Sequence, residues 1–185
     1  LGHAVWCARD LIGDEPFALL LPDVIVPPNG ASCLASMIGI HNRDGGNFVA
    51  VEEVSPELVD QYGIVDVGKT GAGDGVWSVR AMVEKPPVGN APSNLSIMGR
   101  YILQPEIFDI LAGHKTGKGG EIQITDAMEI LMQSQPFHAV KLEGRSFDCG
   151  SKLGFLSANL HLGLEDPATG AALRTELETL LGCQV

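Results

Sequence analysis

Residues 17–23, FALLLPD, form an apolar run that ends in one acidic residue. Five consecutive apolar residues between Pro16 and Pro22, closed by a turn, predict a strand that is buried on both faces and belongs to a parallel sheet. Asp23 would then lie at the carboxyl end of that strand, where ligands bind in open α/β sheets. A carboxylate there could hold a divalent metal against phosphates, although a turn aspartate explains the same stretch equally well.

Strand-like and helix-like segments alternate along the rest of the chain. Strands are expected at 47–54, 62–67, 76–84, 94–103 and 137–142, and helices at 2–11, 31–41, 105–112, 125–132, 151–162 and 167–181. This alternation predicts an α/β protein built around a mainly parallel sheet. No repeat or low-complexity linker divides the chain, so we expect one domain over residues 1–185.

The composition limits the classes of function. Of 185 residues only 12 are Lys or Arg and 23 are Asp or Glu, a formal net charge of −11 that would repel a nucleic acid backbone. The sequence shows no signal peptide and no apolar run of 18 residues, which favours a cytoplasmic protein without membrane contact. The four cysteines form no CxxC pair, so reduced thiols are a simpler interpretation than zinc or a disulfide framework.

Residues 63–70, GIVDVGKT, match the phosphate-loop pattern GxxxxGK[ST]. A phosphate loop requires a strand, then a glycine loop, then a helix whose N-terminus faces the phosphate. Here the four central residues are themselves strand-like, and a glycine-rich stretch followed by β-branched residues comes next. We therefore expect a strand and a hairpin-like connection instead of a phosphate loop.

The segment VEKPP, residues 83–87, ends a strand with an acid, a base and then proline. The proline stops the strand and so fixes where the preceding side chains point. Glu84 could accept hydrogen bonds from sugar hydroxyls while Lys85 contacts a phosphate. The alternative is a solvated ion pair at a strand end, which contributes under about 1 kcal/mol.

Two loops offer further carboxylates. In GGEIQITD, residues 119–126, Thr125 is expected to cap a helix, and Glu121 beside the glycines suits a carboxylate that faces a ligand. In FDCG, residues 147–150, Asp148 precedes a helix. It could cap that helix or complete a two-carboxylate magnesium site with Asp23.

Seven segments follow one another in an order typical of a single family: LGHAV, GDEPFALLLPDVI, YGIVDV, MVEKPP, APSNLSIMGRYIL, GGEIQITDA and SFDCGSKLG. The chain resembles bacterial UTP-glucose-1-phosphate uridylyltransferase, also called UDP-glucose pyrophosphorylase, from Leu1 to about Gly163. The resemblance implies a Rossmann-like three-layer α/β/α sandwich with a mixed, mainly parallel sheet. It also implies transfer of a uridylyl group from UTP to glucose 1-phosphate, which gives UDP-glucose and pyrophosphate.

The resemblance assigns roles to individual residues. It implies Mg²⁺ ligands at Asp23 and Asp148 and a lysine on the glucose phosphate at Lys85, and these three are the expected catalytic residues. The positions implied to bind substrate are Gly2, Gly63, Glu84, Lys85 and Glu121. Relatives of this kind form dimers or tetramers, so a homo-oligomer is expected.

The sequence departs from the family pattern at the N-terminal end of the chain. The family's first strand, its G-x-G-T-R loop and its P-K-E-M segment have no counterpart in the sequence. The chain is therefore expected to be a C-terminal portion of the enzyme and inactive by itself. Two alternatives remain: a nucleotidyltransferase that uses dTTP or CTP, and a non-catalytic regulatory module that binds a sugar phosphate.

Overall fold

A computed structural model describes residues 1–27, 32–68 and 75–182. Within these ranges the backbone separates into two units. The first unit contains Leu1–Leu21 and Pro28–Gly144, and the second contains Pro22–Pro27 and Arg145–Val185. The expectation of one domain over residues 1–185 stays a prediction.

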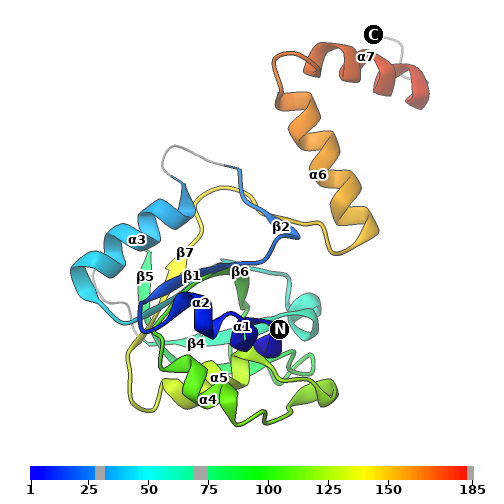
Figure 1. The fold of residues 1–185 in the computed structure, drawn as a ribbon. Coiled ribbons are helices and arrows are strands. Elements are labelled where there is room, and N and C mark those ends of the chain that lie inside the picture. The colour runs from blue at the N-terminus through cyan, green and yellow to red at the C-terminus, as the bar shows by residue number, and fades with distance from the viewer. Residues whose placement is uncertain (28–31, 69–74, 183–185) are drawn as a thin grey trace. The chain divides into compact units, whose positions relative to one another are not determined.

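The first unit is built on a six-stranded mixed sheet with the strand order β1-β6-β3-β7-β5-β4 (Figure 1). Its strands are β1 (Phe17–Leu20), β3 (Asn47–Glu53), β4 (Gly63–Val67), β5 (Val76–Glu84), β6 (Leu95–Leu103) and β7 (Phe137–Lys141). Strands β3 and β7 pair in parallel, whereas β6 runs antiparallel to β1 and β3, and β5 runs antiparallel to β4 and β7. The α/β class and the mixed sheet are confirmed. The expectation of a mainly parallel sheet is wrong for the described strands, because β4 and β5 form a hairpin and β6 reverses direction between two strands that run the other way.

Strand β1 differs from the prediction made for its apolar run. It lies at the end of the strand order and pairs antiparallel with β6, with Phe17 opposite Leu103. Its side chains alternate between half-buried and exposed, and Leu20 is 44% exposed. The prediction of a doubly buried, parallel strand is therefore wrong, because a short apolar run does not distinguish a central strand from an edge strand.

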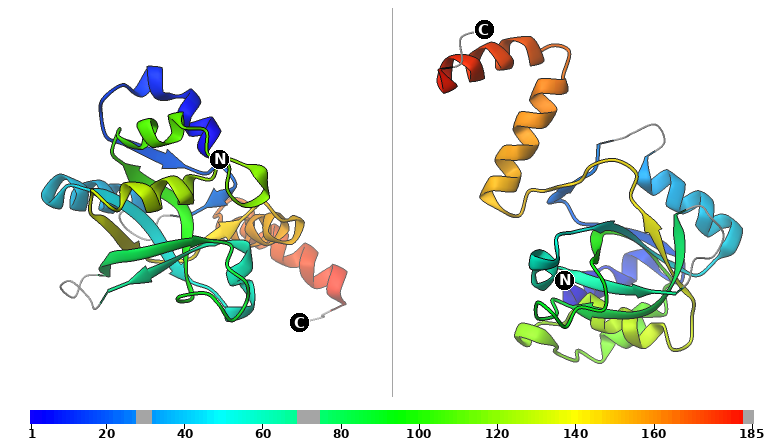
Figure 2. Two further views of the ribbon diagram at one scale, coloured as in Figure 1. Left: turned by 90° about the horizontal axis from the view of Figure 1, so that it is seen from below. Right: turned by 180° about the vertical axis from the view of Figure 1, so that it is seen from behind.

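Helices cover both faces of this sheet (Figures 1 and 2). They are α1 (Gly2–Cys7), α4 (Ile107–Ala112) and α5 (Ile124–Leu131) on one face and α3 (Cys33–Asp44) on the other. Along the buried strand β3, Phe48 and Ala50 pack with Met37 of α3, while Val49 and Val51 join the cluster on the opposite face. Successive strand residues point to opposite faces, so an apolar run of this kind requires a helical layer on each side. The first unit therefore has the three layers that the resemblance implies.

Three short elements complete the first unit: α2 (Arg9–Ile12) and the 3₁₀ helices η1 (Pro56–Gln61) and η2 (Lys118–Gly120). Gly13 follows α2 and Gly45 follows α3, both with φ of 68°. Glycine adopts this left-handed region without steric cost, which explains why the helices end there. The single helix expected at 2–11 is divided into α1 and α2 in the structure.

The second unit consists of a two-stranded antiparallel ribbon followed by two helices. Its elements are β2 (Val24–Ile25), β8 (Phe147–Asp148), α6 (Lys152–Glu165) and α7 (Gly170–Leu181). Between α6 and α7, Asp166 Oδ1 accepts hydrogen bonds from the N–H groups of Ala168 and Thr169 at 2.8 and 2.9 Å. These backbone bonds, with the Thr169 hydroxyl, lower the pKa of Asp166 and fix the turn between the helices.

The described cysteines agree with the expectation of reduced thiols. Cys7, Cys33 and Cys149 are free thiols, whereas Cys183 lies outside the described residues. Burial raises the pKa of the Cys33 thiol, and the charge of Arg100 partly opposes this shift.

In the parts of the chain that the structure describes, no helix combines the length and apolar character needed to cross a bilayer.

Candidate functional site

Asp23 and Asp148 approach each other in the second unit. The pairing of β2 with β8 brings the two segments together, and the N–H of Cys149 donates to the carbonyl oxygen of Asp23 at 2.7 Å. Asp148 Oδ1 lies 3.0 Å, and Asp23 Oδ2 3.2 Å, from the point that a Cβ on Gly150 would occupy. The structure thus directs both predicted carboxylates toward one glycine.

Capping does not explain Asp148. The cap of α6 is Ser151, whose Oγ accepts from the N–H of Gly154 at 3.0 Å. The Asp148 side chain instead accepts from the N–H of Gly150 at 2.9 Å. The backbone oxygen of Asp148 packs against Gly154, where any side chain would collide with it. The loop therefore constrains both the backbone and the carboxylate of Asp148, and this carboxylate lies beside Asp23.

The two carboxylates fit a hard divalent cation. Mg²⁺ is usually held by one or two carboxylates, with the remaining positions taken by water and substrate phosphates. Among the described residues no group of three or more His, Cys, Asp or Glu side chains is placed to hold a metal ion. An ion at Asp23 and Asp148 would therefore need ligands from substrate or water, as a phosphate-bound Mg²⁺ does.

Glu84 is the last residue of β5, and three elements meet at its side chain. Gly63 of β4 lies opposite it in the ladder, and a Cβ on Gly63 would lie 3.3 Å from Glu84 Oε2. Thr125 of α5 donates its hydroxyl to the same oxygen at 2.7 Å. The Glu84 side chain is 15% exposed. Two predicted substrate-binding positions, Gly63 and Glu84, are thus in contact.

Thr125 does not cap α5, so that prediction is wrong. The residue at the N-cap is Gln123, and Thr125 lies in the first turn, 4% exposed. The sequence interpretation relied on the local preference of threonine for helix starts. The actual hydrogen-bond partner is 41 residues away, and no local signal reveals it.

Lys85 follows the end of β5 with a backbone φ of 47°. A positive φ is uncommon for a residue with a Cβ and costs about 1–2 kcal/mol. The ladder maintains it, because the N–H of Lys85 donates to the carbonyl oxygen of Tyr62 at 3.0 Å. Lys85 Nζ lies 3.9 Å from Glu84 Oε1 and its side chain is 48% exposed. Such a half-exposed contact stabilises the fold little.

Gly2, the first residue of α1, contacts the segment that contains Glu121. The N–H of Gly2 donates to the carbonyl oxygen of Ile122 at 2.8 Å, and a Cβ on Gly2 would lie 2.7 Å from that oxygen. Glu121 precedes Ile122, is exposed, and accepts from Gln123 Nε2 at 3.4 Å. Gly120, with φ of 75°, leads into this turn. The turn therefore brings these two predicted positions to adjacent backbone.

The phosphate-loop pattern folds as a strand where it is described. Gly63–Val67 is strand β4, paired antiparallel with β5. Lys69 and Thr70 of the pattern lie outside the described residues. The described part therefore agrees with the predicted strand.

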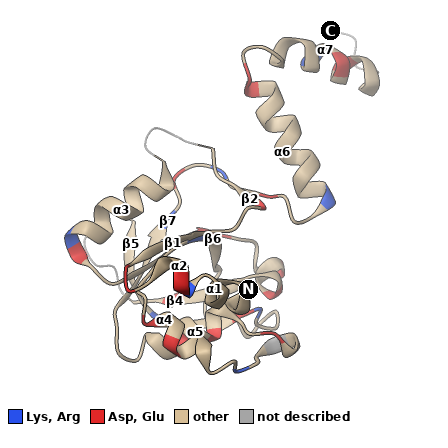
Figure 3. Ribbon diagram, in the orientation of Figure 1, with Lys and Arg blue, Asp and Glu red and all other residues tan. Residues whose placement is uncertain are grey.

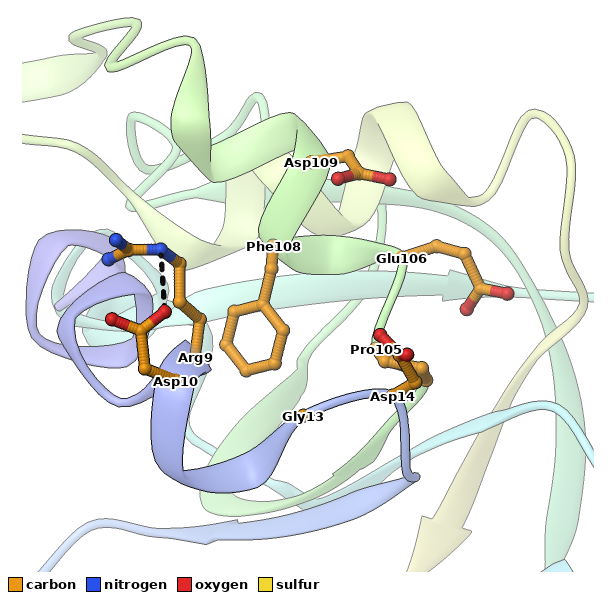
Figure 4. Close-up of a pocket in the computed structure, with 8 residues that line it drawn as sticks. All are labelled: Arg9, Asp10, Gly13, Asp14, Pro105, Glu106, Phe108 and Asp109. Carbon is orange, nitrogen blue, oxygen red and sulfur yellow. Dashed lines mark ion pairs between the residues drawn. The ribbon is translucent and has the colours of Figure 1, made fainter.

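An open cleft of about 540 Å³ lies between α2 and α4 (Figure 4). It is lined by Arg9, Asp10, Gly13, Asp14, Pro105, Glu106, Phe108 and Asp109. Arg9 Nε lies 3.4 Å from Asp10 Oδ1, and its guanidinium stacks on Trp6 at 4.0 Å. None of the predicted site residues lines this cleft.

Acidic residues also occur on α3 and α5 (Figure 3), in agreement with the excess of negative charge.

Comparison with known proteins identifies the family to which the chain belongs. Residues 1–164 match the model of the Nucleotidyl transferase family, and the chain belongs to this family. Within it, the chain is similar to curated UTP–glucose-1-phosphate uridylyltransferases. The identity is 47% over 152 residues with that of Komagataeibacter xylinus, covering 82% of this chain and 52% of the relative. It is 43% over 181 residues with that of Bacillus subtilis strain 168, covering 98% and 61%.

Solved structures give the same result. A UDP-glucose pyrophosphorylase from Acinetobacter baumannii superposes with a TM-score of 0.86 at 43% identity, covering 97% of this chain and 62% of that one. A UTP-bound structure from the same organism gives 0.84 at 44% identity, covering 95% and 60%. A UDP-glucose pyrophosphorylase complexed with UDP-glucose gives 0.85 at 39%, covering 90% and 62%. The chain thus spans less than two thirds of the length of these relatives.

Proposed function

We propose that this chain supplies the sugar-phosphate and metal side of an enzyme that transfers a uridylyl group from UTP to glucose 1-phosphate, giving UDP-glucose and pyrophosphate. The observation that supports the proposal is that, within each unit, predicted site residues that are distant in sequence lie close together. In the second unit Asp23 and Asp148 approach Gly150, and in the first unit Glu84 contacts Gly63 beside Lys85. The similarity to uridylyltransferases over most of the chain supports the choice of reaction.

Each group has a distinct task in this proposal. Glu84 accepts hydrogen bonds from glucose hydroxyls, and Lys85 places a compact positive charge on the sugar phosphate. Gly2, Gly63 and Glu121 line the substrate site. A phosphate oxygen of glucose 1-phosphate attacks the α-phosphorus of UTP in line, and pyrophosphate leaves, so no protein nucleophile is needed. The protein contributes position and charge.

Asp23 and Asp148 are the residues that would hold Mg²⁺. When bound, the ion supplies positive charge that neutralises the phosphates and orients them for displacement. The two carboxylates would fix where that charge lies, because the loop through Gly150 constrains both of them.

Two other functions remain to be distinguished by experiment. An enzyme that uses dTTP or CTP would keep the same sugar and metal residues, and the UTP-bound relative favours UTP. A regulatory module would bind glucose 1-phosphate without turnover. The homo-oligomer, the cytoplasmic location and the identity of the metal stay predictions from the sequence.

The test is UDP-glucose formation by the protein that carries this chain, with UTP, dTTP and CTP compared at equal concentration and Mg²⁺ present. We expect UTP to be used best, and Asp23→Asn or Asp148→Asn to lower the rate by about 100-fold or more, because each removes a metal ligand. Asp60→Asn, at an exposed position of η1, is the matched control and should leave the rate unchanged. Binding of glucose 1-phosphate without turnover on any nucleotide would establish the regulatory alternative.

A further inference from the structure

The hydroxyl of Thr125, in the first turn of α5, makes its hydrogen bond outside its own helix. A helical threonine commonly bonds back to the carbonyl four residues earlier, as Thr175 does to Ala171 at 3.2 Å in α7. Thr125 instead donates across to strand β5, to Glu84 Oε2 at 2.7 Å. The contact joins two elements and involves a carboxylate, so it differs from a local helix contact.

The surroundings of Thr125 leave the hydroxyl little freedom. Its side chain is branched at Cβ and 4% exposed, which restricts rotation about χ1. A Cβ on Gly63 would lie 3.4 Å from Thr125 Oγ1, 3.3 Å from Glu84 Oε2 and 3.3 Å from Ile97 Cδ1. A side chain at Gly63 would therefore press on both the hydroxyl and the carboxylate, which pack closely against this glycine.

A hydroxyl that donates to a carboxylate at this distance forms a charge-assisted hydrogen bond, which is stronger and more directional than a neutral one. The bond uses Glu84 Oε2, whereas Oε1 lies on the side of Lys85, 3.9 Å from Nζ. One carboxylate oxygen is thus fixed by the protein, and the other lies next to the predicted phosphate-binding lysine.

We propose that Thr125 is a positioning residue for sugar recognition: its hydroxyl fixes Glu84 Oε2 so that Oε1 is presented to the hydroxyls of the sugar. This inference rests on the proposed function, since it takes Glu84 as the carboxylate that binds glucose. It adds a residue outside the predicted site and assigns the two oxygens of Glu84 to different partners.

The experiment uses Thr125→Val, which keeps the branched shape and removes the hydroxyl, and Thr125→Ser, which keeps the hydroxyl. Thr175→Val is the matched control, because it removes an exposed helical hydroxyl. In the protein that carries this chain, Thr125→Val should raise KM for glucose 1-phosphate about tenfold and leave KM for UTP unchanged, since a hydrogen bond to a charged group is lost. Thr125→Ser should stay within about twofold of the parent protein, and Thr175→Val should match it. If Thr125→Val does not fold, Thr125→Ala carries the same comparison.

Calorimetric titration with glucose 1-phosphate separates this inference from the proposed function. If the parent protein turns over UTP and Thr125→Val keeps the parent KM and affinity for glucose 1-phosphate, the positioning role is wrong and the proposed function stands. If no UDP-glucose forms but the parent binds glucose 1-phosphate and Thr125→Val binds it about tenfold more weakly, only the proposed function is overturned. Equal rises in both KM values would show a structural effect and overturn the inference, and failure of the parent to bind glucose 1-phosphate would overturn both.

Discussion

Gly150 offers the sharpest test of the paired carboxylates. Its φ is not in the left-handed region, so alanine fits the backbone there. The new Cβ would lie 3.0 Å from Asp148 Oδ1 and 3.2 Å from Asp23 Oδ2, and both contacts are tighter than ordinary van der Waals distances, which start at 3.4 Å. Gly150→Ala should therefore displace both carboxylates by a few tenths of an ångström without creating a cavity or burying a polar group.

A displacement of that size matters for Mg²⁺, which demands near-octahedral geometry at about 2.0–2.1 Å. We expect the Mg²⁺ concentration that gives half the maximal rate to rise about tenfold, which corresponds to about 1.4 kcal/mol of binding free energy. The rate at saturating Mg²⁺ should stay near that of the parent, because neither carboxylate is removed. The assay is UDP-glucose formation over a series of Mg²⁺ concentrations.

Gly39→Ala is the matched control. Gly39 lies in the exposed part of α3, and an added Cβ meets nothing within 4 Å. It should leave the Mg²⁺ requirement unchanged and stabilise the helix by about 0.5–1 kcal/mol. An unchanged Mg²⁺ requirement in Gly150→Ala would refute the reasoning, since it would mean that the metal does not depend on Asp23 and Asp148.

Three further predictions concern single residues. Lys85→Ala should lower kcat by about 100-fold with a melting temperature within a few degrees of the parent, because a half-exposed ion pair stabilises little while phosphate contact requires the charge; near-normal turnover would contradict the role of Lys85. Gly2→Ala should lower the free energy of unfolding in urea by about 2 kcal/mol or more, since its Cβ would lie 2.7 Å from the backbone oxygen of Ile122. Desolvation lowers the pKa of His138 below its ordinary value of 6.5, and the charge of Asp44 partly opposes this shift. At mildly acidic pH the unfolded chain therefore binds more protons at His138 than the folded chain does. The stability that His138 contributes is therefore present above about pH 6.5 and lost as the pH falls through the lower folded value, and urea unfolding of His138→Gln should show a smaller loss between pH 7 and pH 5.

Hydrophobic patterns were enough to predict where most strands and helices lie, because those patterns are local. The expected strand at 76–84 has the same bounds in the structure, and those at 47–54 and 94–103 differ from it by one residue. Whether two strands pair in parallel or antiparallel could not be predicted in the same way. Strand β6 pairs with β1 and β3, which are distant from it in the sequence, and a local pattern does not report such pairing. The same limit explains the error at Phe17–Leu20, where an apolar run lies at an edge.

The site shows the same division between local and distant signals. The hairpin of β4 and β5 places Gly63 opposite Glu84, and the sequence did suggest that hairpin. The meeting of Asp23 with Asp148 depends on a ribbon of only two residue pairs, β2 with β8, which is too short for any pattern to predict. Carboxylate chemistry suggests the pairing as one of two alternatives for Asp148, and the family resemblance then implies it. Thr125 was missed because its local preference for helix starts gave a sufficient explanation for it.

The residues proposed to bind the metal and those proposed to bind the sugar are two sets, each assembled within one unit, and we expect kinetics to separate their contributions. The carboxylates of Asp23 and Asp148 are fixed by the loop through Gly150, whereas Glu84 is fixed by Gly63 and Thr125. A defect in the first set should therefore appear as a greater requirement for Mg²⁺, and a defect in the second set as a higher KM for glucose 1-phosphate. If Gly150→Ala raised only the KM for glucose 1-phosphate, or Thr125→Val only the Mg²⁺ requirement, then Asp23 and Asp148 would not hold the metal or Glu84 would not bind the sugar.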